Sequence, residues 1–433
     1  MSATLGAALA AAASTSPSEA APVRRPVEHI PMDQFAVRDG ELVVGGERLS
    51  VLAARVGQTP FYAYDRGLLR ARVAELRAVL PRAVKLHYAM KANPMPAVVQ
   101  LMAGLVDGID VASAGELKVA LDAGADPAEV SFAGPGKRDP ELVQAVAAGV
   151  LVNVESAREL PVLAAASQAL GRPARVAVRV NPDFELKGSG MKMGGGPKQF
   201  GIDVEQLPGV FAQIRALGLA FEGYHLFAGS QNLKAESICE AQRKSYELAL
   251  RLAELAPSPV RFLNLGGGFG IPYFPGEQRL DLAPIGANLA DLVARAATEL
   301  PEAELVIELG RYFVGEAGVY VSRVVDRKVS RGQVFLVCDG GLHHHLSASG
   351  NFGQVVRKNY PATIGNRLGG GPTEVASAVG PLCTPLDLLA DRMPLPVAEV
   401  GDLVVVFQSG AYGASASPQA FLGHPACTEV LVG

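Results

Sequence analysis

Eight short runs rich in β-branched and other apolar residues alternate with helix-like stretches from residue 84 onward, and this alternation limits the possible folds most strongly. Stretches between the runs, such as PELVQAVAAG, repeat apolar residues at the i, i+3, i+4 spacing of helices that lie on a sheet. Eight βα units over about 230 residues predict an α/β fold, a (β/α)8 TIM barrel, with a doubly wound open sheet as the alternative. The runs are VKLHYAM (84–90), GIDVAS (108–113), EVSFAG (129–134), VLVNV (150–154), RVAVRV (175–180), FEGYHLF (221–227), RFLNL (261–265) and ELVIEL (304–309).

The pattern changes after about residue 318, where segments such as GVYVSRVVDRKVSRGQVFLVCDGG alternate in the manner of strands. Near the start of the chain, FAVRDGELVVGGERLS predicts a hairpin. We therefore expect residues 26–67 and 318–433 to form one β domain, a sandwich or barrel, around a (β/α)8 domain at residues 68–317. Residues 1–25, rich in Ala, Ser and Pro, are predicted to be a disordered tail.

Composition excludes several classes of function. The formal net charge is −4 and no basic stripe is present, so we expect no nucleic-acid partner. No run approaches the ~18 apolar residues of a membrane span, and the N-terminus lacks the basic region of a secretory signal. Four widely spaced cysteines predict neither a zinc knuckle nor a disulfide framework, and a reducing cytoplasm is the expected location. These are Cys239, Cys338, Cys383 and Cys427.

Polar and reactive residues gather where the predicted strands end, which in a barrel is the end that carries active sites. Each has a plain explanation taken alone: an exposed lysine, a core histidine, a glycine turn. Because all of them follow strands of one barrel, the sequence predicts that they share a pocket. They are Lys91, Asp110, Ser113, Arg179, Asn181, His225, Gly266, Gly267, Gly268, Glu308 and Arg311.

These residue types fit the parts of one cofactor. The amine of Lys91 can form a Schiff base with an aldehyde. The GGGFG run lets backbone N–H groups approach a phosphate, and Arg311 adds a fork of donors. Glu308 can hold a proton on a ring nitrogen, and the flat ring of His225 can stack on a heterocycle. An aldehyde, a phosphate, a pyridine nitrogen and a flat ring together describe pyridoxal 5′-phosphate.

From about residue 45 to 430 the chain resembles the fold-type III pyridoxal-phosphate decarboxylases, which include the diaminopimelate, ornithine and arginine decarboxylases and are relatives of alanine racemase. The motifs that carry the resemblance are HYAMKANP, GYHLFAGSQ, NLGGGFG, ELGR, GPLC and SGAYG. The resemblance implies an alanine racemase-like fold and a lysine–cofactor bond at Lys91. It also implies that Cys383 enters the neighbouring subunit's site and helps to protonate the product, so we expect a homodimer with shared active sites.

The motifs and the pocket together give the predicted site. The catalytic residues are Lys91, Cys383, Glu308 and His225. The cofactor-binding residues are Lys91, Asp110, Arg179, His225, Ser230, Gly266, Gly267, Gly268, Glu308, Gly310, Arg311 and Tyr412.

Departures from the family pattern bear on the substrate. Leu309 replaces the proline of the family's EPGR motif, and Thr384 replaces an acidic residue that binds a cationic far end, although Asp387 matches a later aspartate. DGGLHHHLSASGNFGQ replaces a segment that contains an arginine in diaminopimelate decarboxylases. We expect His344 to contact substrate together with Thr384 and Asp387. We expect no metal, because neighbours on a strand point to opposite faces.

The prediction is therefore decarboxylation of an α-amino acid whose far end is uncharged or conjugated. Branches acting on acyl-carrier-protein-bound glutamate, on citryl-ornithine and on substrates of exosortase-associated loci are the most similar. A conventional diaminopimelate decarboxylase making lysine is the alternative. An amino-acid racemase is disfavoured because it needs a second base and has no use for GPLC. A cofactor-free binding protein is disfavoured because Lys91, the glycine triplet and Arg311 are all present.

Overall fold

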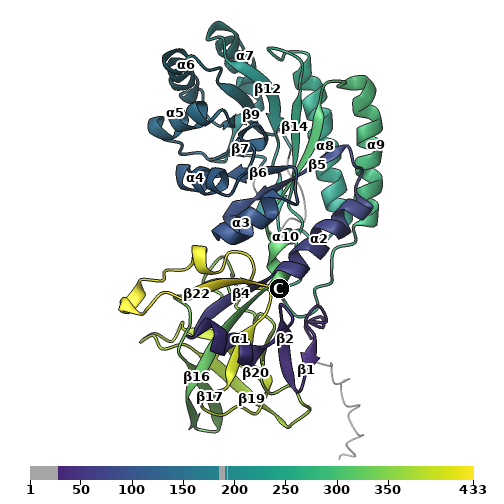
Figure 1. The fold of residues 1–433 in the computed structure, drawn as a ribbon. Helices are drawn as coiled ribbons and strands as arrows, with labels where there is room; N and C mark the ends of the chain where they lie inside the picture. The colour runs from purple at the N-terminus through teal and green to yellow at the C-terminus, as the bar shows by residue number, and fades with distance from the viewer. Residues whose placement is uncertain (1–27, 185–190, 193) are drawn as a thin grey trace, which may run out of the picture.

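A closed barrel of eight parallel strands forms one half of the molecule (Figure 1). The computed structural model describes residues 28–184, 191–192 and 194–433, so the predicted tail lies outside the described residues. Pairing of β8 with β9 closes the ring, which confirms the barrel over the open sheet. The strands are β5 (Val84–Ala89), β6 (Gly108–Val111), β7 (Val130–Phe132), β8 (Leu151–Val154), β9 (Arg175–Asn181), β12 (Ala220–His225), β14 (Phe262–Gly267) and β15 (Glu304–Leu309).

Helices surround the barrel, and their ends follow ordinary capping chemistry (Figure 1). Asp65 accepts from the backbone N–H of Leu68 at the start of α2 (Arg66–Val79), and Ser113 does the same for Glu116 in α4. Ser113 is thus a helix cap. The others are α3 (Pro96–Ala103), α4 (Ala114–Asp122), α5 (Asp139–Ala148), α6 (Glu159–Leu170), α7 (Leu207–Ala216), α8 (Ala235–Ala253), α9 (Ala283–Glu299) and the short α10 (Arg311–Val314).

A mixed sheet forms the second half of the molecule (Figure 1). Strand β4 (Phe61–Asp65), which precedes the barrel in sequence, pairs with both β16 (Gly318–Ser330) and β22 (Thr428–Val432). The N-terminal segment therefore completes the C-terminal domain, as predicted. The other strands are β16 (Gly318–Ser330), β17 (Gln333–Cys338), β18 (Ala362–Ile364), β19 (Thr373–Val379), β20 (Leu388–Pro396), β21 (Leu403–Val406) and β22 (Thr428–Val432).

The predicted N-terminal hairpin is a three-stranded antiparallel meander. It consists of β1 (Val37–Arg38), β2 (Glu41–Val44) and β3 (Glu47–Arg48), followed by α1 (Leu49–Val56). Leu42, Val44 and Leu49 are buried in an apolar cluster with residues of β4, β16 and β21. This packing fixes the N-terminal segment to the β domain.

The carboxyl ends of the barrel strands face the β domain. The backbone N–H of Tyr412 donates to the carbonyl of Ala92, and the Asn93 side chain donates to the carbonyl of Gly410. The predicted active-site residues thus lie where the barrel meets the β domain. Among the described residues, no helix combines the length and apolar character needed to span a bilayer.

Candidate active site

Lys91 stands in a 3-10 turn (Met90–Ala92) that directly follows strand β5. Its side chain is 45% exposed, and its Nζ lies 3.9 Å from Oε1 of Glu308. Partial desolvation of the amine opposes the charged form, but Glu308, Tyr412 and Asp110 outweigh it, so the pKa of Lys91 is raised. The strand ends on a lysine because charged neighbours compensate the ammonium there.

Glu308 is the centre of the charged groups in the site. It is 7% exposed, and its Oε2 lies 3.0 Å from Nε2 of His225. Burial would raise the pKa of Glu308, but His225, Lys91 and Arg179 lower it to about 2. Glu308 is therefore an ionised carboxylate, as a partner for a protonated ring nitrogen must be.

Asp110 projects from β6 and Arg179 from β9, and both are buried. Arg179 donates to Glu155 at 2.9 Å, and its guanidinium carbon lies 4.9 Å from the centre of the Phe200 ring. Asp110 accepts from the Ser131 hydroxyl at 2.6 Å. One Asp110 oxygen, Oδ2, is buried without a hydrogen-bond partner among the described residues.

The glycine triplet is required by the backbone around it. A Cβ at Gly267 would lie 2.0 Å from the carbonyl oxygen of Glu308. Gly268 has φ +74°, and a Cβ there would lie 2.2 Å from the carbonyl oxygen of Gly229, next to Ser230. Gly266 also has positive φ, at +70°. The triplet thus brings the end of β14 against both the Glu308 strand and the Ser230 segment.

Arg311 and Tyr412 close the same side of the site. The guanidinium carbon of Arg311 lies 4.6 Å from the centre of the Tyr412 ring, and Arg311 donates to the Tyr273 hydroxyl at 2.8 Å. Tyr412 has φ +53°, a strained conformation for a residue with a side chain. Gly310 precedes Arg311, and a Cβ there would lie 3.0 Å from the carbonyl oxygen of Ala89.

These groups fit an anionic aldehyde cofactor. Nε of Arg311 is buried and has no hydrogen-bond partner among the described residues, so it is a donor suited to an anion. Lys91 supplies an amine, and Glu308 supplies a negatively charged carboxylate. The residues present therefore fit pyridoxal phosphate.

Two of the predicted substrate residues, Thr384 and Asp387, lie with Cys383 on a turn of the β domain between β19 and β20. Cys383 is exposed there, and the Thr384 hydroxyl accepts from the backbone N–H of Leu386 at 3.3 Å. Asp387 is buried and accepts from the backbone N–H groups of Leu342 and Leu382. Asp387 therefore has a structural role, since it holds the turn that carries Cys383.

The three consecutive histidines do not lie on a strand, contrary to the prediction. Residues 342–344 form a turn, so the premise that His343, His344 and His345 alternate on a strand is wrong. All three are buried, and Nε2 of His344 contacts the carbonyl of Pro425 at 2.8 Å. Burial, with His344 and His424 as neighbours, lowers the pKa of His343 to about 4. Contact of His344 with substrate stays a prediction.

Sequence reasoning missed several residues that support the site. Glu155 holds Arg179, Tyr273 holds Arg311, and Lys91 Nζ lies 5.8 Å from the centre of the Phe227 ring. Their positions in the sequence could have identified two of them as candidates, because Glu155 directly follows strand β8 and Phe227 follows β12 by two residues. Their residue types alone do not mark them as functional.

Comparison with known proteins decides the family. The sequence profile of the family described as "Pyridoxal-dependent decarboxylase, pyridoxal binding domain" matches residues 66–315, more than half of the chain. The chain belongs to the pyridoxal-dependent decarboxylases. It is therefore a carboxy-lyase that uses pyridoxal phosphate, and the predicted fold, cofactor and reaction class are confirmed.

Relatives of this decarboxylase cover nearly its whole length. It is 40% identical over 380 residues to the L-glutamyl-[BtrI acyl-carrier protein] decarboxylase of Niallia circulans, spanning 86% of this chain and 89% of that protein. It is 33% identical over 402 residues to the diaminopimelate decarboxylase of Aquifex aeolicus, spanning 91% of each. The crystal structure of diaminopimelate decarboxylase from Helicobacter pylori complexed with L-lysine aligns with a TM-score of 0.78 at 27% identity, covering 89% of this chain and 94% of that one.

Proposed function

We propose that this decarboxylase acts on an α-amino acid whose far end is uncharged or conjugated. The observation that carries the proposal is Thr384, which follows Cys383 where the family pattern has an acidic residue. Asp387, the other candidate for a cationic group, accepts two backbone N–H groups within its own domain. The 40% identity with a decarboxylase of carrier-bound glutamate supports the same conclusion.

The contacts of the site residues support the roles that we propose for them. Pyridoxal phosphate, when bound, supplies an electron sink for the electron pair released as CO2 leaves. Lys91 would bind the aldehyde and carry a proton on Nζ. Glu308, which is ionised, would hold a proton on the ring nitrogen, and His225 would contact the ring. The glycine triplet, Ser230, Gly310, Arg311 and Tyr412 would hold the phosphate, while Asp110 and Arg179 supply charge around Lys91.

The substrate proposal is tested with free and conjugated amino acids. A site that binds a charged end without its partner loses on the order of 2–5 kcal/mol, roughly 30- to 4000-fold in kcat/KM. We expect free lysine, ornithine, arginine and diaminopimelate to be poor substrates compared with an acylated or carrier-bound analogue. Ordinary turnover of free diaminopimelate, with none of the conjugate, would identify a conventional diaminopimelate decarboxylase instead.

We also propose a homodimer in which Cys383 completes the partner's site and donates a proton to the substrate carbon. Exposed apolar side chains lie on the segments around Cys383 and Tyr412, and a second copy of this chain would cover them. Segment 346–357 contacts both of these segments of its own chain. The Asn351 side chain donates to the carbonyl of Leu386, and the Leu346 N–H donates to the Ser417 hydroxyl. The exposed residues are Phe352, Val355, Val356, Leu386, Phe421 and Leu422.

A mixing experiment tests the shared site. Lys91→Ala and Cys383→Ala subunits are each expected to be inactive, but a mixed dimer contains one intact site. We expect activity to return after subunit exchange, toward about a quarter of the wild-type value if assembly is random. Absence of recovery, with exchange verified by tagged subunits, would count against sharing. A cytoplasmic location stays part of the proposal.

A further inference from the structure

A serine just after the histidine run bonds to one of the residues proposed to hold the phosphate. Ser347 is 5% exposed, and its hydroxyl donates to the backbone carbonyl of Tyr412 at 2.9 Å. Ser347 lies in the β domain, between β17 and β18, and the sequence gave no reason to single it out. The bond therefore joins the segment of the three histidines directly to the active site.

Tyr412 needs support because its backbone is strained. Its φ of +53° lies in the left-handed region, which residues with a side chain rarely adopt. Its N–H donates at 2.7 Å to the carbonyl of Ala92, the residue after Lys91, while Ser347 holds its carbonyl. One hydrogen bond from the barrel and one from the β domain thus fix the backbone that sets the Tyr412 ring 4.6 Å from the guanidinium carbon of Arg311.

His345, the last of the three histidines, supports the same stretch of chain. The ring is fully buried, and its Nδ1 accepts from the backbone N–H of Ala348 at 3.3 Å. Nε2 therefore carries the proton and donates to the Ser409 hydroxyl at 2.9 Å. Burial lowers the pKa of His345 to about 3, so the ring is neutral above that pH and the hydrogen bond persists. Ser409 precedes Tyr412 by three residues, so both ends of this short stretch are held.

The same two residues contact an aromatic side chain behind Arg311. The ring of Tyr360 lies edge-on to that of His345, with 5.8 Å between their centres. Burial raises the pKa of Tyr360, and a hydrogen bond with the Ser347 side chain acts in the opposite direction. The Tyr360 ring packs 4.6 Å from the ring of Tyr273, whose hydroxyl accepts from Arg311. The segment thus reaches both sides of the proposed phosphate site.

We propose that Ser347 is a positioning residue that keeps the Tyr412 side chain beside Arg311, so that both meet the phosphate of the cofactor. This inference rests on the phosphate site given under the proposed function. Without the Ser347 hydroxyl, the Tyr412 backbone can leave its strained conformation and carry its ring away from Arg311. The histidine run gains a role in cofactor binding through its last member, His345, which braces the same stretch.

The test compares two aldehydes that differ only in the phosphate. The full-length chain without cofactor is titrated with pyridoxal 5′-phosphate and with pyridoxal, and the visible absorbance of the bound aldehyde gives each Kd. Ser347→Ala should weaken binding of pyridoxal 5′-phosphate by about fivefold, the equivalent of one neutral hydrogen bond, and leave binding of pyridoxal unchanged. Ser349→Ala is the matched control and should change neither Kd. Ser349 is buried in the same segment, but its hydroxyl donates to the carbonyl of Leu346 at 2.7 Å.

A second measurement uses the protein with its cofactor bound. The phosphorus resonance of bound pyridoxal 5′-phosphate reports on the groups around the phosphate. We expect this resonance to shift in Ser347→Ala and to stay in place in Ser349→Ala. An equal loss of affinity for both aldehydes, or a phosphorus resonance identical to that of the wild type, would mean that Ser347 only stabilises the fold. Either result would overturn the proposal.

Tyr412→Phe separates this proposal from the phosphate site on which it rests. It removes the proposed phosphate contact and should weaken binding of pyridoxal 5′-phosphate alone. A selective loss in Tyr412→Phe with none in Ser347→Ala would reject the role of Ser347 and leave the phosphate site standing. No selective loss in Tyr412→Phe would reject the phosphate site, and the role of Ser347 with it.

Discussion

The two ends of the barrel carry the same kinds of residue and use them differently. Strand β5 has Lys85 at its start and Lys91 just after its end. Strand β9 has Arg175 and Arg179, and strand β15 has Glu304 and Glu308. Sequence composition alone does not separate these two sets.

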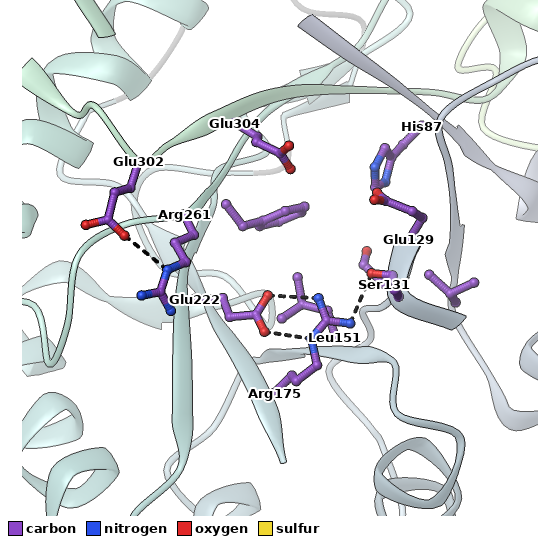
Figure 2. Close-up of a pocket in the computed structure, with 12 residues that line it drawn as sticks. His87, Glu129, Ser131, Leu151, Arg175, Glu222, Arg261, Glu302 and Glu304 are labelled. Carbon is purple, nitrogen blue, oxygen red and sulfur yellow. Dashed lines mark hydrogen bonds and ion pairs between the residues drawn. The ribbon is translucent and has the colours of Figure 1, made fainter. Parts of the chain in front are cut away.

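At the amino-terminal ends of the barrel strands, the charged side chains pair with one another. Arg175 meets Glu222 through two hydrogen bonds of 2.6 and 2.9 Å, drawn in Figure 2. Lys85 lies 2.8 Å from both Glu129 and Glu304. Such partly exposed pairs contribute modestly to stability and leave no group for a ligand.

At the active-site end the charges are left incompletely paired. Lys91 is 3.9 Å from Glu308, one oxygen of Asp110 has no partner, and Nε of Arg311 has none among the described residues. Buried polar groups without partners are costly, so a protein retains them where a ligand completes the pairing. The difference between the two ends is thus one of pairing, and three matched pairs of variants test it.

The lysine pair should give the largest effect. Lys91→Ala removes the amine that binds the cofactor, so the visible absorbance of bound cofactor should vanish and kcat should fall by at least about 10³-fold. Lys85→Ala, at the other end of β5, should keep the absorbance and kcat and cost at most about 1 kcal/mol of unfolding free energy. Absorbance spectra measure the bound cofactor, kinetics measure kcat, and denaturant titrations measure the free energy of unfolding. An intact cofactor band and full turnover in Lys91→Ala would remove Lys91 from the site.

The arginine pair compares the stability contributed by a buried ion pair with that of a partly exposed one. Arg179→Ala leaves the buried Glu155 carboxylate without its cation, which should lower the free energy of unfolding by about 3 kcal/mol. Arg175→Ala leaves Glu222 partly exposed, so the expected loss is about 1 kcal/mol. Denaturant unfolding without cofactor compares the two variants. Equal losses would mean that the two ends do not differ in this respect.

The glutamate pair should differ in how the free energy of unfolding depends on pH, and this difference in slope is confined to acid. The pKa of Glu308 is lowered to about 2 in the folded chain against 4.5 ordinarily, so its contribution is complete above pH 4.5 and is lost as pH falls toward 2. That contribution is roughly 3 kcal/mol at most. Unfolding free energy should therefore decline less steeply below pH 4.5 in Glu308→Gln than in the wild type. Glu304→Gln should follow the wild-type curve. Parallel curves for Glu308→Gln and the wild type would contradict the assignment.

Much of the fold and site was predictable because the signals are local. The eight runs were strands because period-2 and period-3.6 patterns depend on neighbouring residues alone. Lys91, Glu308 and Arg311 could be predicted to lie together because a strand's carboxyl end is visible in the sequence and a barrel brings all such ends together. The histidine run was misjudged because a turn and a strand tip share composition, and only packing against Pro425 decides between them.

The sequence by itself determined the barrel, the order of its strands, the cofactor chemistry and the family. The tertiary structure decided which charges are paired. It set Lys85 against Glu129 and Glu304, left Lys91 beside a Glu308 already in contact with His225, and linked His87 to Asp110 across two strands. It also placed β4 between β16 and β22, more than 250 residues away in sequence. Pairing and burial depend on distances between residues far apart in the chain, and these residues become neighbours only in the closed barrel.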